Sequence, residues 1–404
     1  MRPSIPTSPD KIVILLTVLT FLNNLSLQIF LPAMPAIQVT FGATAGETQL
    51  LISLSFVVFG LAMLIYGPLS DIFGRRTVFL FGFSIYTIGN FASVLAPTLW
   101  LLIIARVVAA AGASVGMTLS RAVVRDVFPR DRTAGVVAKI SMVAVLSPIA
   151  APLIGGALTE FMGWRTLFVF LTVTGIASVF IVLLWLPETL RRSSRSVPLS
   201  IILSGSLRLL TSRSFRTYAL QGTFAMAAFF AFMTAAPFVY IQVLGLSHSE
   251  YGLYYMTTII GFLAGYFIAA KLSASVGMNR MIVIGTILAF AAACICVLNV
   301  VAGLWTPIAL TAPVVAMAIA TGIATPNSQA GVIGGDLRTV GAASGLAGFL
   351  QMMFGAVVVQ AVGILHDGTP YPMVILMLGS SSLALLTIVW GFRSFLKDTP
   401  NTSL

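Results

Sequence analysis

The chain has 404 residues, 58% of them hydrophobic and only 8% charged, and its 22 basic and 11 acidic side chains give a net charge of +11 at pH 7. Soluble domains carry about 25% charged residues, so this composition excludes a soluble globular protein and indicates one that spans a membrane. The two cysteines, Cys294 and Cys296, lie in one apolar segment and are interpreted as packing residues.

Twelve apolar segments predict membrane-spanning helices, because a bilayer core of about 30 Å needs about 20 apolar residues per helix. The runs are long and continuous, which favours helices over the short alternating strands of a membrane barrel. We therefore predict an all-α integral membrane protein. The expected spans are residues 12–31, 48–69, 77–95, 100–123, 135–158, 166–186, 218–243, 251–272, 281–301, 307–323, 341–365 and 372–395.

The basic residues orient these spans. With the N-terminus in the cytoplasm, Lys and Arg fall in the two tails and in every second connection, except Arg106 within a span and Arg165 in an outer loop. This asymmetry follows the positive-inside rule and predicts that both termini are cytoplasmic. Attraction to anionic lipid headgroups accounts for the basic charge, so we expect the lipid bilayer as a partner and no nucleic acid.

One short loop motif occurs twice. Residues 69–74 read LSDIFG after the second apolar segment, and residues 272–277 read LSASVG at the corresponding place half a chain later. The second copy has lost the acidic residue. Duplication of this kind is typical of transporters built from parallel repeats. It predicts two pseudo-symmetric bundles of six transmembrane helices each.

The boundaries of the two bundles follow from the most polar stretch between them. We place an N-terminal six-helix bundle at 1–186, a cytoplasmic linker at 187–216 and a C-terminal six-helix bundle at 217–404. Within the linker, residues 199–210 form either a short amphipathic helix on the inner membrane surface or a plain connection.

Further motifs follow one another in a characteristic order. They are LPAMP at 31–35, GPLSDIFGRR at 67–76, Arg106 with Gly112, SPIAAPLIGG at 147–156, GWRTLF at 163–168, PET at 187–189 and APFVY at 236–240. In this order they resemble the major facilitator superfamily, and more narrowly its Bcr/CflA-type multidrug efflux transporters, a group of twelve-helix drug:proton antiporters. The resemblance extends over nearly the whole chain.

The resemblance implies the major facilitator fold and a location in the bacterial inner membrane. We expect a monomer, because one chain already contains both halves. The resemblance also implies secondary active efflux of small apolar drugs by proton antiport with alternating access. The sequence offers no nucleotide-binding loop, no metal-spaced His/Cys set and no nucleophile–base pair, so we predict that the protein is not an enzyme and uses neither a cofactor nor a metal. An uptake permease or uncoupled facilitator for a small metabolite, and a sensor that does not transport, are the alternatives.

The loop at 67–76 is a candidate gate. We expect Asp71 at the N-terminus of the following helix, where the helix dipole favours a carboxylate. It should also lie within reach of the basic loop after the fourth span, which holds Arg121, Arg125, Arg130 and Arg132. An ion pair there would lock the outward-facing state and open when the halves move, whereas the alternative is a solvated turn. The candidate gating residues of this loop are Gly67, Asp71, Gly74, Arg75 and Arg76.

A proline- and glycine-rich motif with Pro148, Pro152, Gly155 and Gly156 lies in the fifth predicted span. Proline kinks a helix because it removes a backbone hydrogen bond, and small residues allow neighbouring helices to approach closely. The motif therefore predicts a bent, closely packed helix, and the resemblance associates it with antiport. We add these four residues to the candidate gate, with structural packing alone as the alternative.

Arg106 lies in the outer part of the fourth predicted span, where burying an arginine costs about 2.5–3.5 kcal/mol. We expect it to face a wet cavity or a hydrogen-bonding partner, or else to extend to the outer headgroups. All 11 acidic residues fall in loops, tails or helix ends. The resemblance implies a proton-carrying aspartate three residues before the LP of the first helix, but this chain has Gln28 there.

These features predict a cavity of neutral to positive potential, which suits neutral or anionic apolar drugs, such as phenicols, better than lipophilic cations. Protons are still the expected coupling ion, and Glu47 is the spare candidate for their carrier. The candidate substrate-binding and coupling residues are Asn24, Gln28, Glu47, Arg106 and Gln351. Met and aromatic residues of the seventh span would add apolar surface, although most residues of this kind face lipid or pack.

Overall fold

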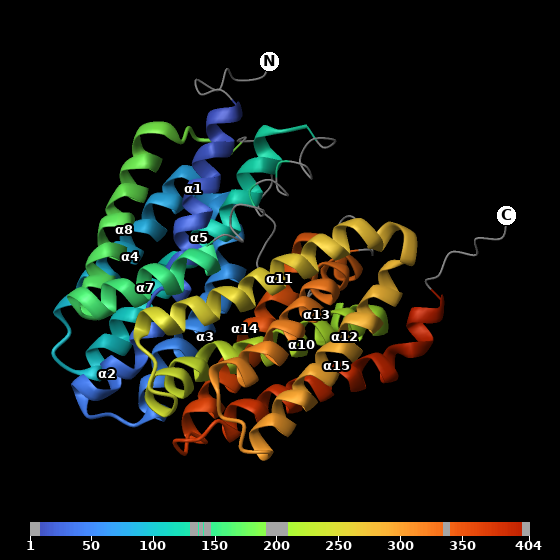
Figure 1. Cartoon of the computed structure of the whole chain (residues 1–404). Helices are drawn as coiled ribbons and strands as arrows, with labels where there is room; N and C mark the ends of the chain where they lie inside the picture. The colour runs from blue at the N-terminus through green and yellow to red at the C-terminus, as the bar shows by residue number, and fades with distance from the viewer. Residues whose placement is uncertain are drawn as a thin grey trace. The chain divides into compact units, whose positions relative to one another are not determined.

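The computed structural model describes residues 9–129, 136, 140, 147–190, 209–333 and 340–397 of the chain. Throughout these residues the backbone consists of helices joined by turns and short connections, and it contains no strand (Figure 1). The all-α class predicted from the long apolar runs is therefore confirmed.

The first half of the chain contains one short 3₁₀ helix, η1, and seven described α-helices. In chain order they are α1 (Pro9–Gln28), η1 (Leu31–Ala33), α2 (Met34–Phe41), α3 (Ala45–Phe73), α4 (Arg75–Leu95), α5 (Leu99–Val127), α7 (Ser147–Met162) and α8 (Arg165–Trp185).

The second half begins with α10, which passes directly into a short π-helix, η2. Its described elements are α10 (Arg213–Pro237), η2 (Phe238–Val243), α11 (His248–Val276), α12 (Met278–Val301), α13 (Pro307–Ile333), α14 (Val340–Ile364) and α15 (Tyr371–Lys397).

Eleven helical segments in the described ranges are long and apolar enough to cross a membrane. The predicted span at 135–158 is described continuously only from Ser147 onward, where α7 contributes a shorter apolar stretch, Ala150–Met162. The predicted span at 307–323 is too short, because α13 continues through Pro326 to Ile333. Membrane helices tolerate such a proline when neighbouring groups satisfy the freed backbone.

The first predicted span, 12–31, ends three residues earlier than expected. α1 ends at Gln28, and a 3₁₀ turn over Leu31–Ala33 precedes α2. Pro32 and Pro35 explain the break, because proline lacks a backbone N–H and disfavours helical geometry in the residue before it. The last four carbonyl groups of a helix have no partner within it, so the end of α1 leaves carbonyl groups, among them that of Ser26, free to accept hydrogen bonds from other elements.

The chain divides into two compact units. The first comprises Met1–Pro198 with Ser247–Gly252, and the second comprises Leu199–Leu246 with Leu253–Leu404. The predicted linker boundaries, 187–216, stay a prediction. Of the proposed amphipathic helix at 199–210, only residues 209 and 210 are described, and they are helical.

Close contact between α4 and α5 organises the first unit. A Cβ added to Gly89 would collide with the backbone of Ala109, and one added to Gly112 would collide with the backbone of Gly82. Arg106 lies three residues before Ala109 and therefore shares this face of α5. Glycine packing thus brings the side chain of Arg106 toward α4.

Candidate functional site

Arg106 on α5 lies in the interior of the first unit, with only 1% of its surface exposed. Its guanidinium carbon is 4.3 Å from the ring centroid of Phe30, just after α1, and 5.7 Å from that of Phe168 on α8. The faces of aromatic rings attract cations, so the two rings favour this position. The alternative in which Arg106 extends to the outer headgroups is therefore wrong.

Two polar groups bind the guanidinium. Nη1 donates to Oδ1 of Asn90 on α4 at 3.1 Å, and Nη2 donates to the carbonyl oxygen of Ser26 at 3.5 Å. The Ser26 carbonyl lies in the last turn of α1, among those that have no partner within the helix. Asn90 is held in place because its Nδ2 donates to the carbonyl of Tyr86 at 2.9 Å. Of the predicted environments, the structure supplies the hydrogen-bonding partner.

Both hydrogen-bond acceptors and both rings around Arg106 are electrically neutral. The salt bridges found within the described ranges both involve Arg75, so Arg106 forms none with a carboxylate there. A buried cation without a counter-ion gives its surroundings a positive potential. This is the charge condition on which the predicted preference for neutral or anionic drugs depends.

A second polar position lies between α1 and α5. Asn23 is 2% exposed, and neither its Oδ1 nor its Nδ2 has a partner among the residues described. About one turn earlier, the hydroxyls of Thr20 and Ser120 are 3.0 Å apart. α1 thus turns Asn23 toward the interior, whereas the predicted Asn24 is half-buried. The two asparagines are adjacent, so the rotation of α1 about its axis decides which of them faces the interior.

The other predicted binding residues are more accessible. Gln28 is half-buried at the end of α1, and Gln351 is half-buried on α14 of the second unit. Glu47 is exposed at the start of α3, where its Oε2 accepts bonds from the backbone N–H and hydroxyl of Thr44 at 2.8 and 2.9 Å. This capping box gives Glu47 a structural role, and its role as proton carrier stays a prediction.

The proline- and glycine-rich motif places α7 against the end of α1. Pro152 lies inside α7, and a Cβ added to Gly155 would collide with the carbonyl oxygen of Ile29. Only glycine fits this contact without a backbone shift. Pro148 and Gly156 belong to the same helix. The close helix packing that the motif predicted is thus present, while its role in gating stays a prediction.

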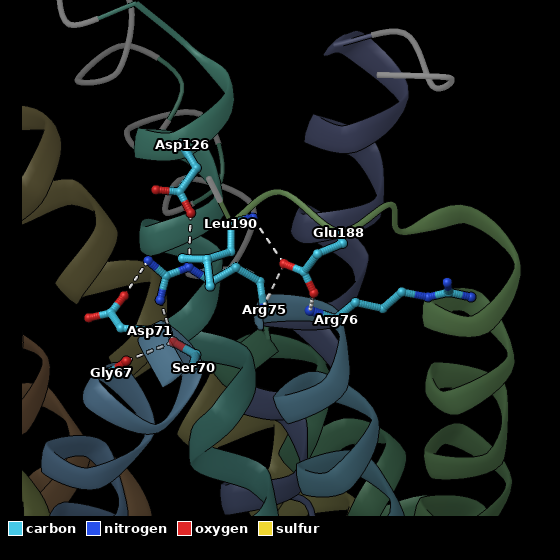
Figure 2. Close-up of polar contacts among 8 residues, drawn as sticks. All are labelled: Gly67, Ser70, Asp71, Arg75, Arg76, Asp126, Glu188 and Leu190. Carbon is cyan, nitrogen blue, oxygen red and sulfur yellow. Dashed lines mark hydrogen bonds and ion pairs between the residues drawn. The ribbon is translucent and has the colours of Figure 1, made fainter. Parts of the chain in front are cut away.

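A cluster of charges joins the ends of α3 and α5 to the start of α4 (Figure 2). Arg75 is 2% exposed, and it forms salt bridges with Asp71 at 2.6 Å and, through Nε, with Asp126 at 2.8 Å. It also donates to the hydroxyl of Ser70, which donates in turn to the carbonyl of Gly67 at 2.7 Å. Two carboxylates therefore compensate one buried guanidinium, through charge-assisted hydrogen bonds of the strong kind.

Glu188, which follows α8, caps the start of α4 (Figure 2). Its two carboxylate oxygens accept from the backbone N–H groups of Arg75 at 2.9 Å and Arg76 at 3.2 Å, where the helix dipole favours a negative charge. Gly74 permits this approach, because it has a φ of 94° and a Cβ there would collide with Glu188. Nη2 of Arg76 donates to the carbonyl of Leu183 at 2.6 Å, which also ties α4 to α8.

The predicted ion pair between Asp71 and the basic loop after the fourth span is not present among the described residues, and Arg130 and Arg132 of that loop lie outside them. Asp71 lies in the last turn of α3, and the N-terminus of α4 is occupied by Glu188 instead. Arg125 is exposed, and its neighbour Asp126 links α5 to the loop. The cross-helix pair therefore has its charges reversed, with the arginine in the loop and the acid on α5. Glu188 was not predicted as a site residue, although it lies in the PET motif at 187–189 already singled out from the sequence.

Comparisons with known proteins agree with this architecture. The family model described as Major Facilitator Superfamily matches residues 16–360. The bicyclomycin resistance protein homolog of Haemophilus influenzae is 25% identical, over 90% of this chain and 92% of that protein. The chloramphenicol resistance protein of Pseudomonas aeruginosa is 28% identical, over 94% of this chain and 89% of that protein.

A solved structure is similar over almost the whole chain. It is that of a bacterial homolog of the human lysosomal transporter Spinster, in an inward-facing and unoccupied conformation. The TM-score is 0.77 at 17% identity, and the match covers 97% of this chain and 99% of the other. At this identity the likeness bears on the fold alone.

Proposed function

The chain belongs to the major facilitator superfamily, and from this premise we propose that it exports small apolar drugs of neutral or anionic charge across the bacterial inner membrane. It is a multi-pass membrane transporter and not an enzyme. Relatives named for resistance to bicyclomycin and chloramphenicol support drug export as the class of transport. The observation that carries the substrate class is the buried Arg106, whose hydrogen-bond acceptors and ring contacts are neutral.

Electrostatics supports this choice of substrates. A charge acts more strongly in a low dielectric than in water, so a lipophilic cation near Arg106 would be repelled, while a neutral phenicol would not. Gln28 keeps hydrogen-bonding capacity near the end of α1 without adding a negative charge. We propose that Asn24, Gln28 and Arg106 contribute to substrate binding in the first unit, and Gln351 in the second.

Protons are the coupling ion that we propose. The acidic residues in the described ranges lie at helix ends and in connections, so none of these is a carboxylate in the middle of a span. Glu47 is the candidate carrier at the outer end of α3. An uncoupled facilitator, or an uptake permease for a small metabolite, is the competing function. Because one chain contains both halves, the transporting form is a monomer.

The cluster around Arg75 is the proposed gate. Its contacts fasten α3, α4 and α5 to one another, and Glu188 adds the segment after α8. Alternating access requires contacts that hold one state and are released in the other. Gly67, Gly74 and Arg76 shape this cluster, and Pro148, Pro152, Gly155 and Gly156 set the path of α7.

The gate predicts unequal effects of two neighbouring substitutions. Asp126→Asn leaves the buried Arg75 with one carboxylate in place of two, and breaking a buried pair is costly. We expect the transport rate to fall about fivefold or more, since about 1 kcal/mol already changes a two-state equilibrium by that factor. Arg125→Gln, at an exposed position, should leave the rate nearly unchanged. A larger effect of Arg125→Gln would favour the Asp71–Arg125 pairing instead.

Export is tested in a bacterium that lacks its own drug exporters. Expression of the chain should lower the intracellular level of a phenicol and raise the concentration needed to stop growth. A cationic dye of similar size should be affected much less. Higher intracellular phenicol on expression would indicate uptake and contradict the proposed direction. A protein carrying Arg106→Met, produced at the same level, is the matched control.

A further inference from the structure

The second unit contains a small cavity between α10, α12, α13 and α15, whose surface is mostly apolar but includes several polar groups. Four of its lining residues are polar, namely Gln221, Thr286, Thr321 and Ser381, and the rest are alanine or glycine. Its volume of about 10 Å³ is close to the least that holds one water molecule. The cavity is therefore too small for a drug and large enough for a single water.

Two hydroxyl groups of this lining lack partners. Thr321 is 1% exposed and Ser381 is 2% exposed, and neither hydroxyl has a hydrogen-bond partner among the residues that the structure describes. Other buried hydroxyls of these helices donate to the carbonyl four residues earlier, as Thr325 does to Thr321 at 2.8 Å and Thr286 does to Ile282 at 2.8 Å. Thr321 and Ser381 do not form this bond, although any helical serine or threonine can form it.

A hydrogen-bonded chain ends at the same cavity. Nε2 of Gln221 donates to the hydroxyl of Thr286 at 2.8 Å, and the hydroxyl of Ser328 donates to Oε1 of Gln221. A side-chain amide carries two N–H donors, and the bond to Thr286 uses one of them. Gln221, Thr321 and Ser381 together offer the roughly three polar contacts that a buried water usually makes.

We propose that this cavity binds one water molecule, which joins Thr321 and Ser381 to the Gln221 chain and so links α13 and α15 to α10 and α12. Buried waters occupy cavities that offer them polar partners, and this lining, although mostly apolar, contains one amide and three hydroxyls, two of them without a partner among the described residues. A cation is disfavoured because the lining contains no carboxylate and a charge is costly to bury without one. The water would make these four helices one hydrogen-bonded body.

The test is thermal unfolding of the full chain in detergent or lipid nanodiscs. Thr321→Val and Ser381→Ala should each lower the midpoint by about 2–4 °C, because each removes a contact of the bound water. The double variant should lose less than the sum, since both changes act on one molecule. Thr321→Ser, which keeps the hydroxyl, should lose clearly less than Thr321→Val.

A matched control is Ser382→Ala, whose hydroxyl bonds within its own helix to the carbonyl of Leu378 at 2.7 Å; it should not couple to Thr321→Val. Unchanged or raised midpoints in both single variants would overturn the proposal, because removal of unsatisfied hydroxyls stabilises a protein. An experimental density map that resolves ordered waters provides a second, independent test. A peak within hydrogen-bonding distance of both hydroxyls supports the proposal, and a cavity without one contradicts it.

Discussion

Replacing Arg106 by methionine is expected to lower drug transport about tenfold or more while the protein stays folded. Methionine is long, flexible and apolar, so it can fill the space between Phe30 and Phe168. It cannot donate to Asn90 Oδ1 or to the Ser26 carbonyl. A hydrogen bond from a charged group contributes about 1.5–3 kcal/mol, and about 1.4 kcal/mol corresponds to a factor of ten. Initial rates of phenicol transport in proteoliposomes measure the loss.

Two variants show whether the charge or the shape of Arg106 matters. Arg106→Lys keeps the charge but not the planar fork of donors, so its rate should lie between those of the wild type and the methionine variant. Arg165→Met removes an arginine that lies over Trp164, 4.2 Å from its ring centroid, and donates to the carbonyl of Ala96; it should transport normally. Full transport by a correctly folded Arg106→Met protein would remove Arg106 from the binding site.

Gln28→Asp is expected to change the substrate preference toward lipophilic cations. The substitution adds a negative charge at the end of α1, two residues after Ser26, whose carbonyl accepts from Arg106. A carboxylate there would offset the positive potential of the site. At an effective dielectric constant of about 20, a unit charge changes the energy of a nearby ion by about 1–4 kcal/mol. We therefore expect export of a cationic dye to rise about tenfold and export of a phenicol to fall.

The matched control for this change is Gln28→Asn, which shortens the side chain without adding a charge. It should alter both rates modestly and in the same direction, because it changes packing and not potential. The cationic dye and the phenicol are measured in the same proteoliposome preparation, so that the amount of protein is the same for both rates. A folded, active Gln28→Asp protein with no gain for the cation would refute the argument from potential.

Much of the fold could be predicted because its cause is local. Apolar runs of membrane length sufficed to predict the helices, and the described helices follow them. The end of α1 was predicted three residues too late, and the 3₁₀ turn that follows was not predicted, because an apolar run hides such a turn. The predicted span at 307–323 ended before Pro326. α13 instead continues through Pro326, because a membrane helix tolerates such a proline.

The candidate site was predictable only in part, because helix rotation and long-range partners are set by packing. The insertion cost of an arginine indicated that Arg106 needs a partner, but not that the partners are Asn90 and the Ser26 carbonyl. Asn23, rather than Asn24, faces the interior. In helices that are apolar on most sides, hydrophobic periodicity does not reveal which face is buried.

Ion partners were harder still to predict. Opposite charges in two loops suggested a pair between Asp71 and the basic loop after the fourth span, yet the described pair that crosses the helices is Arg75 with Asp126. Each loop contains both signs of charge, so composition cannot choose between the pairings. Glu188 is separated from Arg75 by more than a hundred residues, and only the folded arrangement of α4 and α8 brings the two together.

We propose that Arg106, a buried cation with no carboxylate partner among the described residues, selects neutral drugs for export. The most direct test of this claim is the flux of chloramphenicol and of a lipophilic cation of similar size in proteoliposomes, with and without an imposed proton gradient. We predict that the wild type accumulates chloramphenicol against its gradient, faster than the cation, and that Arg106→Met does not. Faster transport of the cation, or chloramphenicol flux unaffected by Arg106→Met, would contradict the claim.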